Sequence, residues 1–273
     1  MNRKDIAIIT QEIIILLTHK GGLRVLIVGV FDHFLRVIGK NLFVDFNYIW
    51  NNKNGMEIGG PSHIFESGGL LPIYESVHSM IFVDYNSITV WQKTREDILG
   101  RLKEKLRYEL VVSEASELKE IPEGSLDFIL SSHVLEHLAN PLKAVLRWKQ
   151  LLHVGGYIIV IIPDARFMFD HRRAITTIDH FLEDYKDNID EDDMTHISEI
   201  IKLHDQTMDK AVESRDNFIK RISNNKEYRT AHHHVFIPNN VSELMLKAGL
   251  REVYLKNFLP FHIVGIYKKT ERN

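Results

Sequence analysis

Polar and ionisable side chains stand at the ends of four apolar segments of this chain. Three ends carry a carboxylate and the fourth carries serine, histidine and glutamate: Glu57, Asp84, Glu114 and the stretch from Ser131 to His137. A carboxylate can accept hydrogen bonds from two neighbouring hydroxyls, and an imidazole can exchange a proton near neutral pH. If these ends meet, they form a binding site for a hydroxyl-bearing ligand with a proton acceptor beside it.

The four apolar segments have the composition of strands in a parallel sheet. They cover residues 56–58, 80–83, 108–112 and 126–130, and each is followed by polar residues. Parallel strands that are buried on both faces read as short continuous apolar runs. Ligands of open α/β sheets bind at the carboxyl ends of such strands. The sequence therefore predicts that the four polar ends line one crevice.

Residues 124–164 predict a strand, a helix and a second strand. Asn140 is a favourable N-cap, Pro141 suits the first helical position, and apolar residues follow at helical spacing. The Gly155-Gly156 pair is expected to end this helix. The β-branched run 157–162 is then a second buried strand, so the segment forms a right-handed crossover.

Further elements complete the predicted sheet and its cover. A charged helix is expected over 91–107, and another over 241–249 that ends at Gly249. Two last strands are expected from Arg251 to Phe258 and from Phe261 to Tyr267. The apolar stretch 24–34 holds a single glycine, so it lacks the spacing of a dinucleotide-binding turn and receives no cofactor contact.

The Gly59-Gly60 pair can bring backbone N–H groups close to a ligand, because glycine adopts conformations that other residues avoid. About 24 residues further on, Asp84 ends the next strand, where a carboxylate commonly binds both hydroxyls of a ribose. The glycine turn and the carboxylate together indicate a nucleoside-containing cofactor.

The order of these motifs resembles the class I S-adenosylmethionine-dependent methyltransferases. The resemblance rests on MEIGGPS, VDYN, VVSEASEL, LDFILSSHVLEH and LLHVGGYIIVIIP over about residues 50–165, and covers 235–270 again. It implies an α/β fold with a Rossmann-like, mostly parallel seven-stranded sheet, helices on both faces and a closing antiparallel pair. It also implies S-adenosyl-L-methionine as the cofactor.

The resemblance further implies a role for each polar strand end. The loop around the methionine part of the cofactor is expected at Glu57, Gly59, Gly60 and Ser62. The ribose is expected at Asp84, Tyr85 and Asn86, the adenine at Glu114 and Ala115, and the sulfonium beside Ser131, Ser132 and His133. The family's third glycine and long first helix are replaced by Pro61-Ser62, Ser67–Gly69 and Pro72, so this helix is expected to be short or broken.

Four parts of the chain follow from this interpretation. They are an N-terminal helical extension (1–50), a cofactor-binding α/β core (51–164), a helical insertion or lid (165–230) and the C-terminal part of the core (231–273). The stretch 163–185 resembles methyltransferases associated with surface glycans, which implies O-methylation of a sugar or glycan hydroxyl. In it, Arg172-Arg173 suits an anionic substrate or a structural ion-pair turn.

A hydroxyl acceptor needs a base, and histidine is the natural type near neutral pH. The candidates are His137, His171, His180 and His234, and His171 and His180 are preferred because they follow the last cofactor-side strand. In an extended segment His232 and His234 point the same way, and His180 and Asp184 share the face of a helix capped by Thr177. These four could bind a metal, but packing or hydroxyl binding is favoured and no metal site is assigned.

Composition limits the partners. The net charge of −3 gives no electrostatic footprint for nucleic acid, and no apolar run reaches the ~18 residues of a membrane span. The N-terminal apolar stretch is expected to be a helix rather than a signal, which leaves peripheral membrane contact open. The absence of cysteine excludes disulfides and thiolate metal sites and fits the cytoplasm, the predicted location. A homo-oligomer stays open.

Other functions compete with this interpretation. The acceptor could be another small molecule or a protein, and the long charged insertion would also suit an inactive cofactor-binding module that serves assembly. A nicotinamide oxidoreductase is disfavoured, because Gly59-Gly60 lacks the G-x-G-x-x-G spacing.

Overall fold

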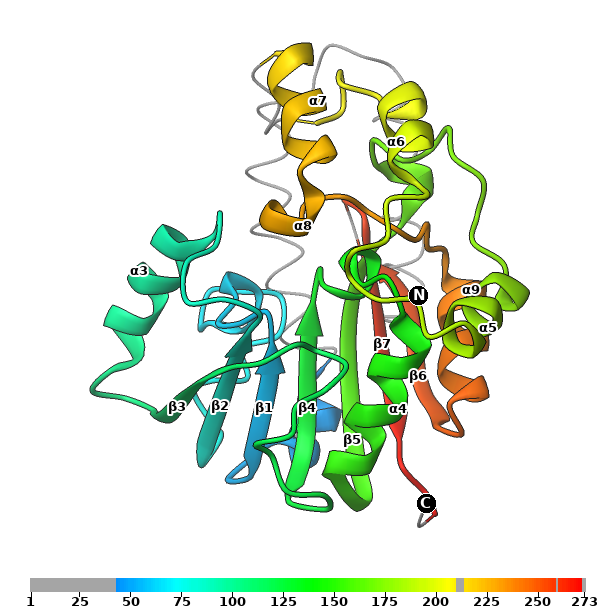
Figure 1. Cartoon of the computed structure of the whole chain (residues 1–273). Helices are drawn as coiled ribbons and strands as arrows, with labels where there is room; N and C mark the ends of the chain where they lie inside the picture. Colours follow the sequence, from blue (N-terminus) through cyan, green and yellow to red (C-terminus); the bar gives the residue numbers. More distant parts are fainter. Residues whose placement is uncertain (1–42, 210–213, 259, 272–273) are drawn as a thin grey trace, which may run out of the picture.

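The computed structural model describes residues 43–209, 214–258 and 260–271, and in them seven strands form one sheet. The strand order is β3-β2-β1-β4-β5-β7-β6. β1 to β5 pair in parallel, and β7 runs antiparallel between β5 and β6, which confirms the predicted fold class (Figure 1). The strands are β1 (Asn54–Ile58), β2 (Ser79–Asp84), β3 (Arg107–Val112), β4 (Leu126–Ser132), β5 (Leu152–Pro163), β6 (Arg251–Phe258) and β7 (His262–Lys268).

The strand order places a topological switch point between β1 and β4. The chain moves outward from β1 through β2 to β3 and then returns to β4 on the other side of β1. In such sheets the crevice beyond the carboxyl ends at the switch point is where ligands bind. Figure 1 shows these carboxyl ends at the top of the sheet, with α6, α7 and α8 above them.

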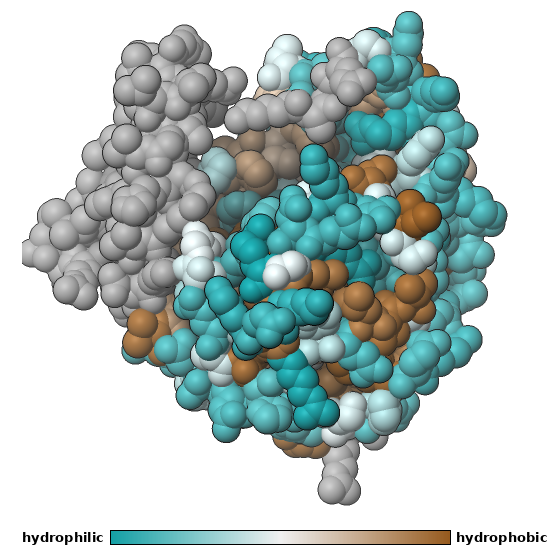
Figure 2. Space-filling view, turned by 90° about the vertical axis from the view of Figure 1, so that its left-hand side faces the viewer, coloured by the Kyte–Doolittle hydropathy of each residue, from teal (hydrophilic) through white to brown (hydrophobic). Residues whose placement is uncertain are grey.

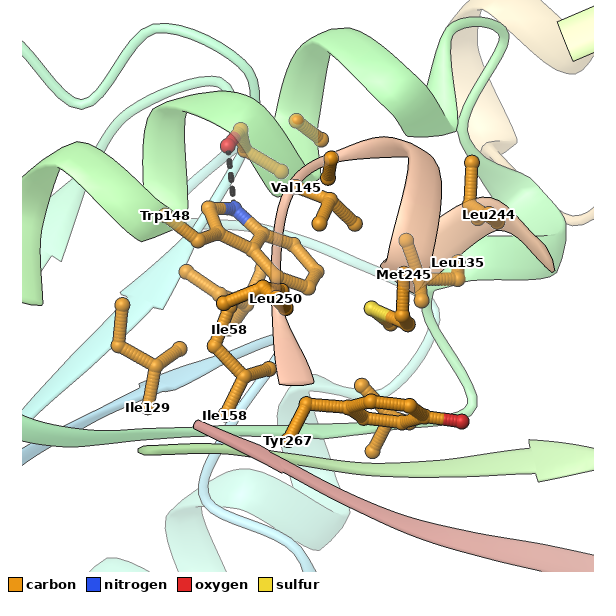
Figure 3. Close-up of a cluster of buried hydrophobic side chains, with 14 of the residues drawn as sticks. Ile58, Ile129, Leu135, Val145, Trp148, Ile158, Leu244, Met245, Leu250 and Tyr267 are labelled. Carbon is orange, nitrogen blue, oxygen red and sulfur yellow. Dashed lines mark hydrogen bonds between the residues drawn. The ribbon is translucent and has the colours of Figure 1, made fainter. Parts of the chain in front are cut away.

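One face of the sheet is covered by α4 (Pro141–Leu151), α5 (Ile178–Lys186) and α9 (Pro238–Lys247). As predicted, Asn140 caps α4 by accepting a hydrogen bond from the Lys143 N–H, and Thr177 caps α5. Trp148 of α4 is fully buried in the core between these helices and the sheet (Figure 3). Its indole N–H donates to the Ala115 carbonyl at 2.7 Å, which fixes the loop after β3.

The other face is covered by α3 (Gln92–Leu102) and by irregular segments around it. Ile98 and Leu102 of α3 pack with Trp50, Phe65 and other aromatic side chains into a second apolar core. At the position expected for a long first helix, the chain has only the 3₁₀ turn His63–Phe65. The prediction of a short or broken helix is therefore confirmed.

The insertion between β5 and β6 continues after α5 with α6 (Ile197–Leu203), α7 (Arg215–Ser223) and α8 (Asn225–Tyr228). These helices have a small apolar core of their own, formed by Ile197, Ile200, Phe218, Ile222 and Ala231. Because they lie above the carboxyl ends in Figure 1, the insertion covers the edge of the sheet where the crevice is expected.

Most predicted strands match the observed ones to within two residues, but the helix of the central crossover ends earlier than predicted. α4 ends at Leu151, and Gly155-Gly156 lies inside β5, where the register to β4 shifts. Gly155 has a φ of +92°, and a side chain at Gly156 would lie 2.9 Å from the Asp127 carbonyl. The glycines therefore allow an irregular stretch of strand to approach β4 and do not end the helix.

Two other predicted helices have shifted bounds. α3 ends at Leu102, five residues before the predicted end, and Arg107 already belongs to β3. α9 begins at Pro238, three positions before the predicted start, and Gly249 follows its end with a φ of +77°. The N-terminal stretch to residue 42, including 24–34, lies outside the described residues, and no helix within the described ranges has the length and apolarity to cross a membrane.

The edge strand β3 leaves apolar side chains exposed. Leu110 and Val112 of β3, and Ile88, Val90 and Trp91 before α3, are each about half exposed or more. Figure 2 views this side of the molecule and shows apolar groups interspersed among polar ones.

Candidate binding site at the carboxyl edge of the sheet

The carboxyl end of β1 is organised by Glu57, which is fully buried. Its carboxyl group accepts a hydrogen bond from the Ser62 hydroxyl at 2.6 Å and another from the Tyr74 hydroxyl. Burial raises the pKa of Glu57 to about 8, so the group is mostly protonated at neutral pH. With its oxygens engaged inside the protein, Glu57 holds the turn over residues 59–62 in place.

The glycines of this turn are required by close packing. Gly59 has a φ of +74°, and a side chain there would lie 2.6 Å from Val134 in the loop after β4. A side chain at Gly60 would collide with the Glu57 carboxyl group. The ends of β1 and β4 are thereby brought into contact at the switch point, as the crevice prediction requires.

At the end of β2, Asp84 accepts hydrogen bonds from the Tyr85 N–H at 2.9 Å and from Arg95 of α3 at 3.2 Å. Burial raises the pKa of Asp84, and the Arg95 guanidinium opposes this effect. Asn86 is exposed and accepts from the Ile88 N–H within its own loop. The predicted ribose carboxylate thus occupies the expected strand end, and Arg95 is a partner that sequence reasoning missed.

Arg229 of the insertion connects the ends of β2 and β3. Its guanidinium lies 3.0 Å from the Glu114 carboxylate and 2.7 Å from Glu191, and it stacks 5.2 Å from the ring centre of Tyr85. The Tyr85 hydroxyl also donates to the Glu227 carbonyl of α8 at 3.2 Å. Two residues assigned to the cofactor, Tyr85 and Glu114, are therefore held by the insertion.

We expect Arg229→Ala to loosen this attachment, because it leaves the mostly buried Glu191 carboxylate and the partly exposed Glu114 carboxylate without their cation. The cost should be about 1–3 kcal/mol and should be largely local. Hydrogen exchange of residues 224–231 should then be faster by roughly 10-fold or more, with the exchange of β4 and β5 unchanged. Lys220→Ala, at an exposed position of α7, is the control. Equal protection in both variants would contradict the role of Arg229.

At the end of β4, the residues predicted to lie beside the sulfonium differ in solvent exposure. Ser131 lies inside the strand and is almost fully buried, whereas Ser132 and His133 are partly exposed at its end. His133 has a left-handed backbone with a φ of +54°, and its Nε2 lies 3.1 Å from Nδ1 of His262 at the start of β7. His133 is thus placed beside the switch point, but Ser131 is enclosed.

Glu136, which the sequence places after β4 without a predicted role, is 1% exposed, and no hydrogen-bond partner of either carboxylate oxygen exists within the described residues. Burial opposes its ionisation, yet the imidazoles of His133, His137 and His232 keep the pKa of Glu136 below its usual value. Burial and the neighbouring His232 lower the pKa of His137 to about 4, so His137 is neutral. A buried carboxylate with histidine neighbours therefore follows β4 directly.

The three consecutive histidines diverge, so the prediction that His232 and His234 point the same way is wrong. The segment is not a regular strand. His232 bonds to Asp170, His233 to Asn225, and Nε2 of His234 donates to the Ala139 carbonyl at 3.2 Å. His180, Asp184 and His234 do come together, but His232 belongs to a different group, with Glu136 and His137.

The four histidines predicted as bases differ in exposure. The side chains of His171 and His180 are 33% and 35% exposed, that of His137 is 18% exposed, and that of His234 is 1% exposed. Nδ1 of His171 donates to the Met168 carbonyl at 3.0 Å, whereas Nε2 of His180 lies 3.2 Å from Nε2 of His196. His171 and His180 are thus the accessible members of the set.

The arginine pair after β5 is mostly structural. Arg173 is buried and bonds to Asp170 and to the carbonyls of His232 and His233. Arg172 is half exposed and pairs with Asp205 at 2.7 Å. Of the two alternatives left open by the sequence, the ion-pair turn describes Arg173.

Comparison with known proteins gives one family match. A family model described as "Methyltransferase domain" matches residues 70–160, from just before β2 into β5. A SAM-dependent methyltransferase from Aquifex aeolicus has 12% identity and a TM-score of 0.48, with 85% of this chain and 89% of that chain covered. The 1,6-didemethyltoxoflavin-N1-methyltransferase of Burkholderia thailandensis has 14% identity and a TM-score of 0.49, with 99% and 92% covered. No curated protein sequence matches the chain significantly.

The family model matches a methyltransferase domain over residues 70–160, about a third of the chain, and the observed sheet order is the one expected for the predicted fold. The residues at the carboxyl edge of the sheet fit the expected cofactor, S-adenosyl-L-methionine. Asp84 offers a carboxylate at the end of β2, the β1 turn meets the β4 loop at the switch point, and Ala115 is fixed beside them by Trp148.

Proposed function

We propose that this protein transfers the methyl group of S-adenosylmethionine to a hydroxyl of a sugar or surface glycan. The observation that carries the proposal is the meeting of polar strand ends at the β1/β4 switch point, beneath an insertion that holds Tyr85 and Glu114. The glycan class rests on the resemblance of residues 163–185. Of the arginine pair that could bind an anionic acceptor, Arg173 is engaged internally and Arg172 pairs with Asp205.

Methyl transfer is an in-line displacement, for which the bound cofactor supplies an activated methyl group. The protein then has to align the acceptor, exclude water and accept the hydroxyl proton. We assign the last task to His171, with His180 as the alternative. The Met168 carbonyl fixes the proton on Nδ1 of His171, which leaves the lone pair of Nε2 to act as the base. His137 and His234 are less suitable because they are more enclosed.

Calorimetric titration with S-adenosylmethionine and S-adenosylhomocysteine tests the cofactor part of this proposal. The full chain should bind both, and Asp84→Asn should weaken binding by roughly 10- to 100-fold, because a hydrogen bond to a charged group is worth about 1.5–3 kcal/mol. Exposed Glu104→Gln is the control variant. No binding at millimolar ligand would rule out the methyltransferase proposal.

A methyl-transfer screen tests the acceptor. Nucleotide sugars, lipid-linked glycans and oligosaccharides are incubated with the protein and cofactor, and products are read by mass shift. Transfer to a hydroxyl of one of these classes is the expected result. Cofactor binding without transfer to any acceptor, proteins and other small molecules included, would instead favour an inactive assembly module.

A further inference from the structure

We infer that Glu136, His137 and His232 bind a divalent transition-metal ion of the Zn²⁺ type beside the carboxyl end of β4. Glu136 and His137 come from the turn Leu135–His137 after β4, and His232 comes from the segment that returns from the insertion. Each offers one ligand atom, and the three atoms lie within 4.8 Å of one another. The inference does not depend on the proposed methyl transfer.

The Glu136 carboxylate provides the first argument. It is 1% exposed, and neither of its oxygens has a hydrogen-bond partner in the described part of the chain. Its nearest imidazole nitrogens are Nδ1 of His133 at 3.5 Å and Nε2 of His137 at 4.0 Å. A buried carboxylate that accepts no hydrogen bond is costly unless a cation compensates it. A metal ion between Glu136 and the histidines would provide that cation.

The histidines provide the second argument. Nδ1 of His137 donates to the Ala231 carbonyl at 3.0 Å, and Nδ1 of His232 bonds to the Asp170 carboxylate. Asp170 is in turn held by Arg173 at 3.1 Å. Metal-bound histidines usually donate their second ring N–H to a carbonyl or carboxylate in this way, which orients the ring and leaves Nε2 as the ligand atom. Both imidazoles therefore already have the outer partners of a metal site.

The ligand set decides which metals fit. Two imidazole nitrogens and one carboxylate oxygen suit Zn²⁺, Co²⁺ or Fe²⁺, whereas Mg²⁺ and Ca²⁺ prefer oxygen ligands throughout. Tetrahedral Zn²⁺ with bonds of about 2.0–2.1 Å holds its ligands roughly 3.4 Å apart. The three ligand atoms must therefore draw together on binding. Three protein ligands leave at least one coordination position for water or an acceptor oxygen.

A second group of His180, Asp184 and His234 satisfies the same distance limit but is less suited. Nε2 of His234 donates to the Ala139 carbonyl, and Nε2 of His180 faces His196 at 3.2 Å. The carbonyl leaves Nδ1 of His234 open to a ligand, but Nε2 of His180 is taken by a second imidazole and the His180 side chain is 35% exposed, so this group lacks the enclosure of the first. The second group therefore serves as an internal control for non-specific metal binding by a histidine-rich protein.

The test uses the full chain, freed of its affinity tag and of metal by chelation, and titrated with Zn²⁺ and Co²⁺. We expect one equivalent of Zn²⁺ to bind by calorimetry and mass spectrometry, and Co²⁺ to give the visible absorption of a low-coordinate site. Glu136→Gln and His232→Gln should each lower the Zn²⁺ affinity by at least 10-fold, whereas Asp184→Asn should not. Mg²⁺ at the same concentration should give no heat.

Two results would overturn the inference. One is the absence of Zn²⁺ and Co²⁺ binding at high micromolar metal. The other is Zn²⁺ binding that is unchanged by Glu136→Gln and His232→Gln. Far-ultraviolet circular dichroism of every variant shows whether it is folded, and Glu136→Gln keeps the shape of the side chain, so this arm of the test does not depend on a disruptive substitution.

Discussion

His171→Gln is expected to lower kcat by about 10²- to 10⁴-fold while the affinity for S-adenosylhomocysteine stays within a factor of about two, since general-base catalysis contributes an effect of this size. His171 follows the end of β5, and its side chain is one-third exposed. Its Nδ1 donates a hydrogen bond to the Met168 carbonyl. The variant removes Nε2, which lies 3.6 Å from the Asp205 carboxylate, but leaves the strand ends of β1 to β4 untouched. Methyl transfer is measured with the acceptor that the mass-shift screen identifies.

The control and the alternative base are tested in the same assay. His78→Ala, at an exposed position before β2, should retain the wild-type rate. A loss in His180→Ala with full activity of His171→Gln would move the base to α5. If the single variants of His171, His180, His137 and His234 all keep the wild-type rate, no histidine of the predicted set is the base.

The sequence predicts best those structural features that depend on residues close together in the chain. The strands are located correctly because each is a short apolar run, although β3 at the sheet edge is largely exposed, and α4 begins as predicted because Asn140 and Pro141 act on their own first turn. The polar ends follow from the strands, since parallel strands present all their carboxyl ends at one edge. These local signals are sufficient to place the polar strand ends at one edge of the sheet.

The prediction is wrong where a contact joins distant segments. Gly155-Gly156 resembles a helix end, but the approach to the Asp127 carbonyl is what requires Gly156. His232 and His234 separate because the segment carries no strand pairing to impose alternation. No local pattern signals these tertiary contacts.

The same reason explains the functional residues that were missed. Arg229 reaches Tyr85 and Glu114 from the far end of the insertion, so its role depends on how the insertion folds back over the sheet. Glu136 was placed within a promising loop, but its burial and lack of a hydrogen-bond partner become visible only when the returning segment 231–234 is packed against it. From the sequence alone, a charged residue in a loop is expected to be exposed to solvent.

Glu57 makes stability depend on pH in a direction opposite to that of most carboxylates. Burial is the main cause of its raised pKa of about 8, against a usual value of 4.5, and Ser62, Tyr74 and Arg95 only partly oppose it. Between about pH 5 and 8 the folded protein keeps the proton and the unfolded chain does not. Its contribution to stability is therefore fully present below about pH 4.5 and is lost as pH rises through 8.

Glu57→Gln should consequently remove a decline in the free energy of unfolding that the wild-type protein shows between about pH 5 and 8. One such group contributes up to about 1.4 kcal/mol per pH unit, or a few kcal/mol over this window. The amide keeps the shape of the side chain and can still bond to Ser62 and Tyr74. Urea unfolding at several pH values measures the slope, with exposed Glu120→Gln as the control. A slope that is the same in wild type and Glu57→Gln would show that Glu57 is ionised in the folded protein, and the turn over residues 59–62 would then be held by a carboxylate anion.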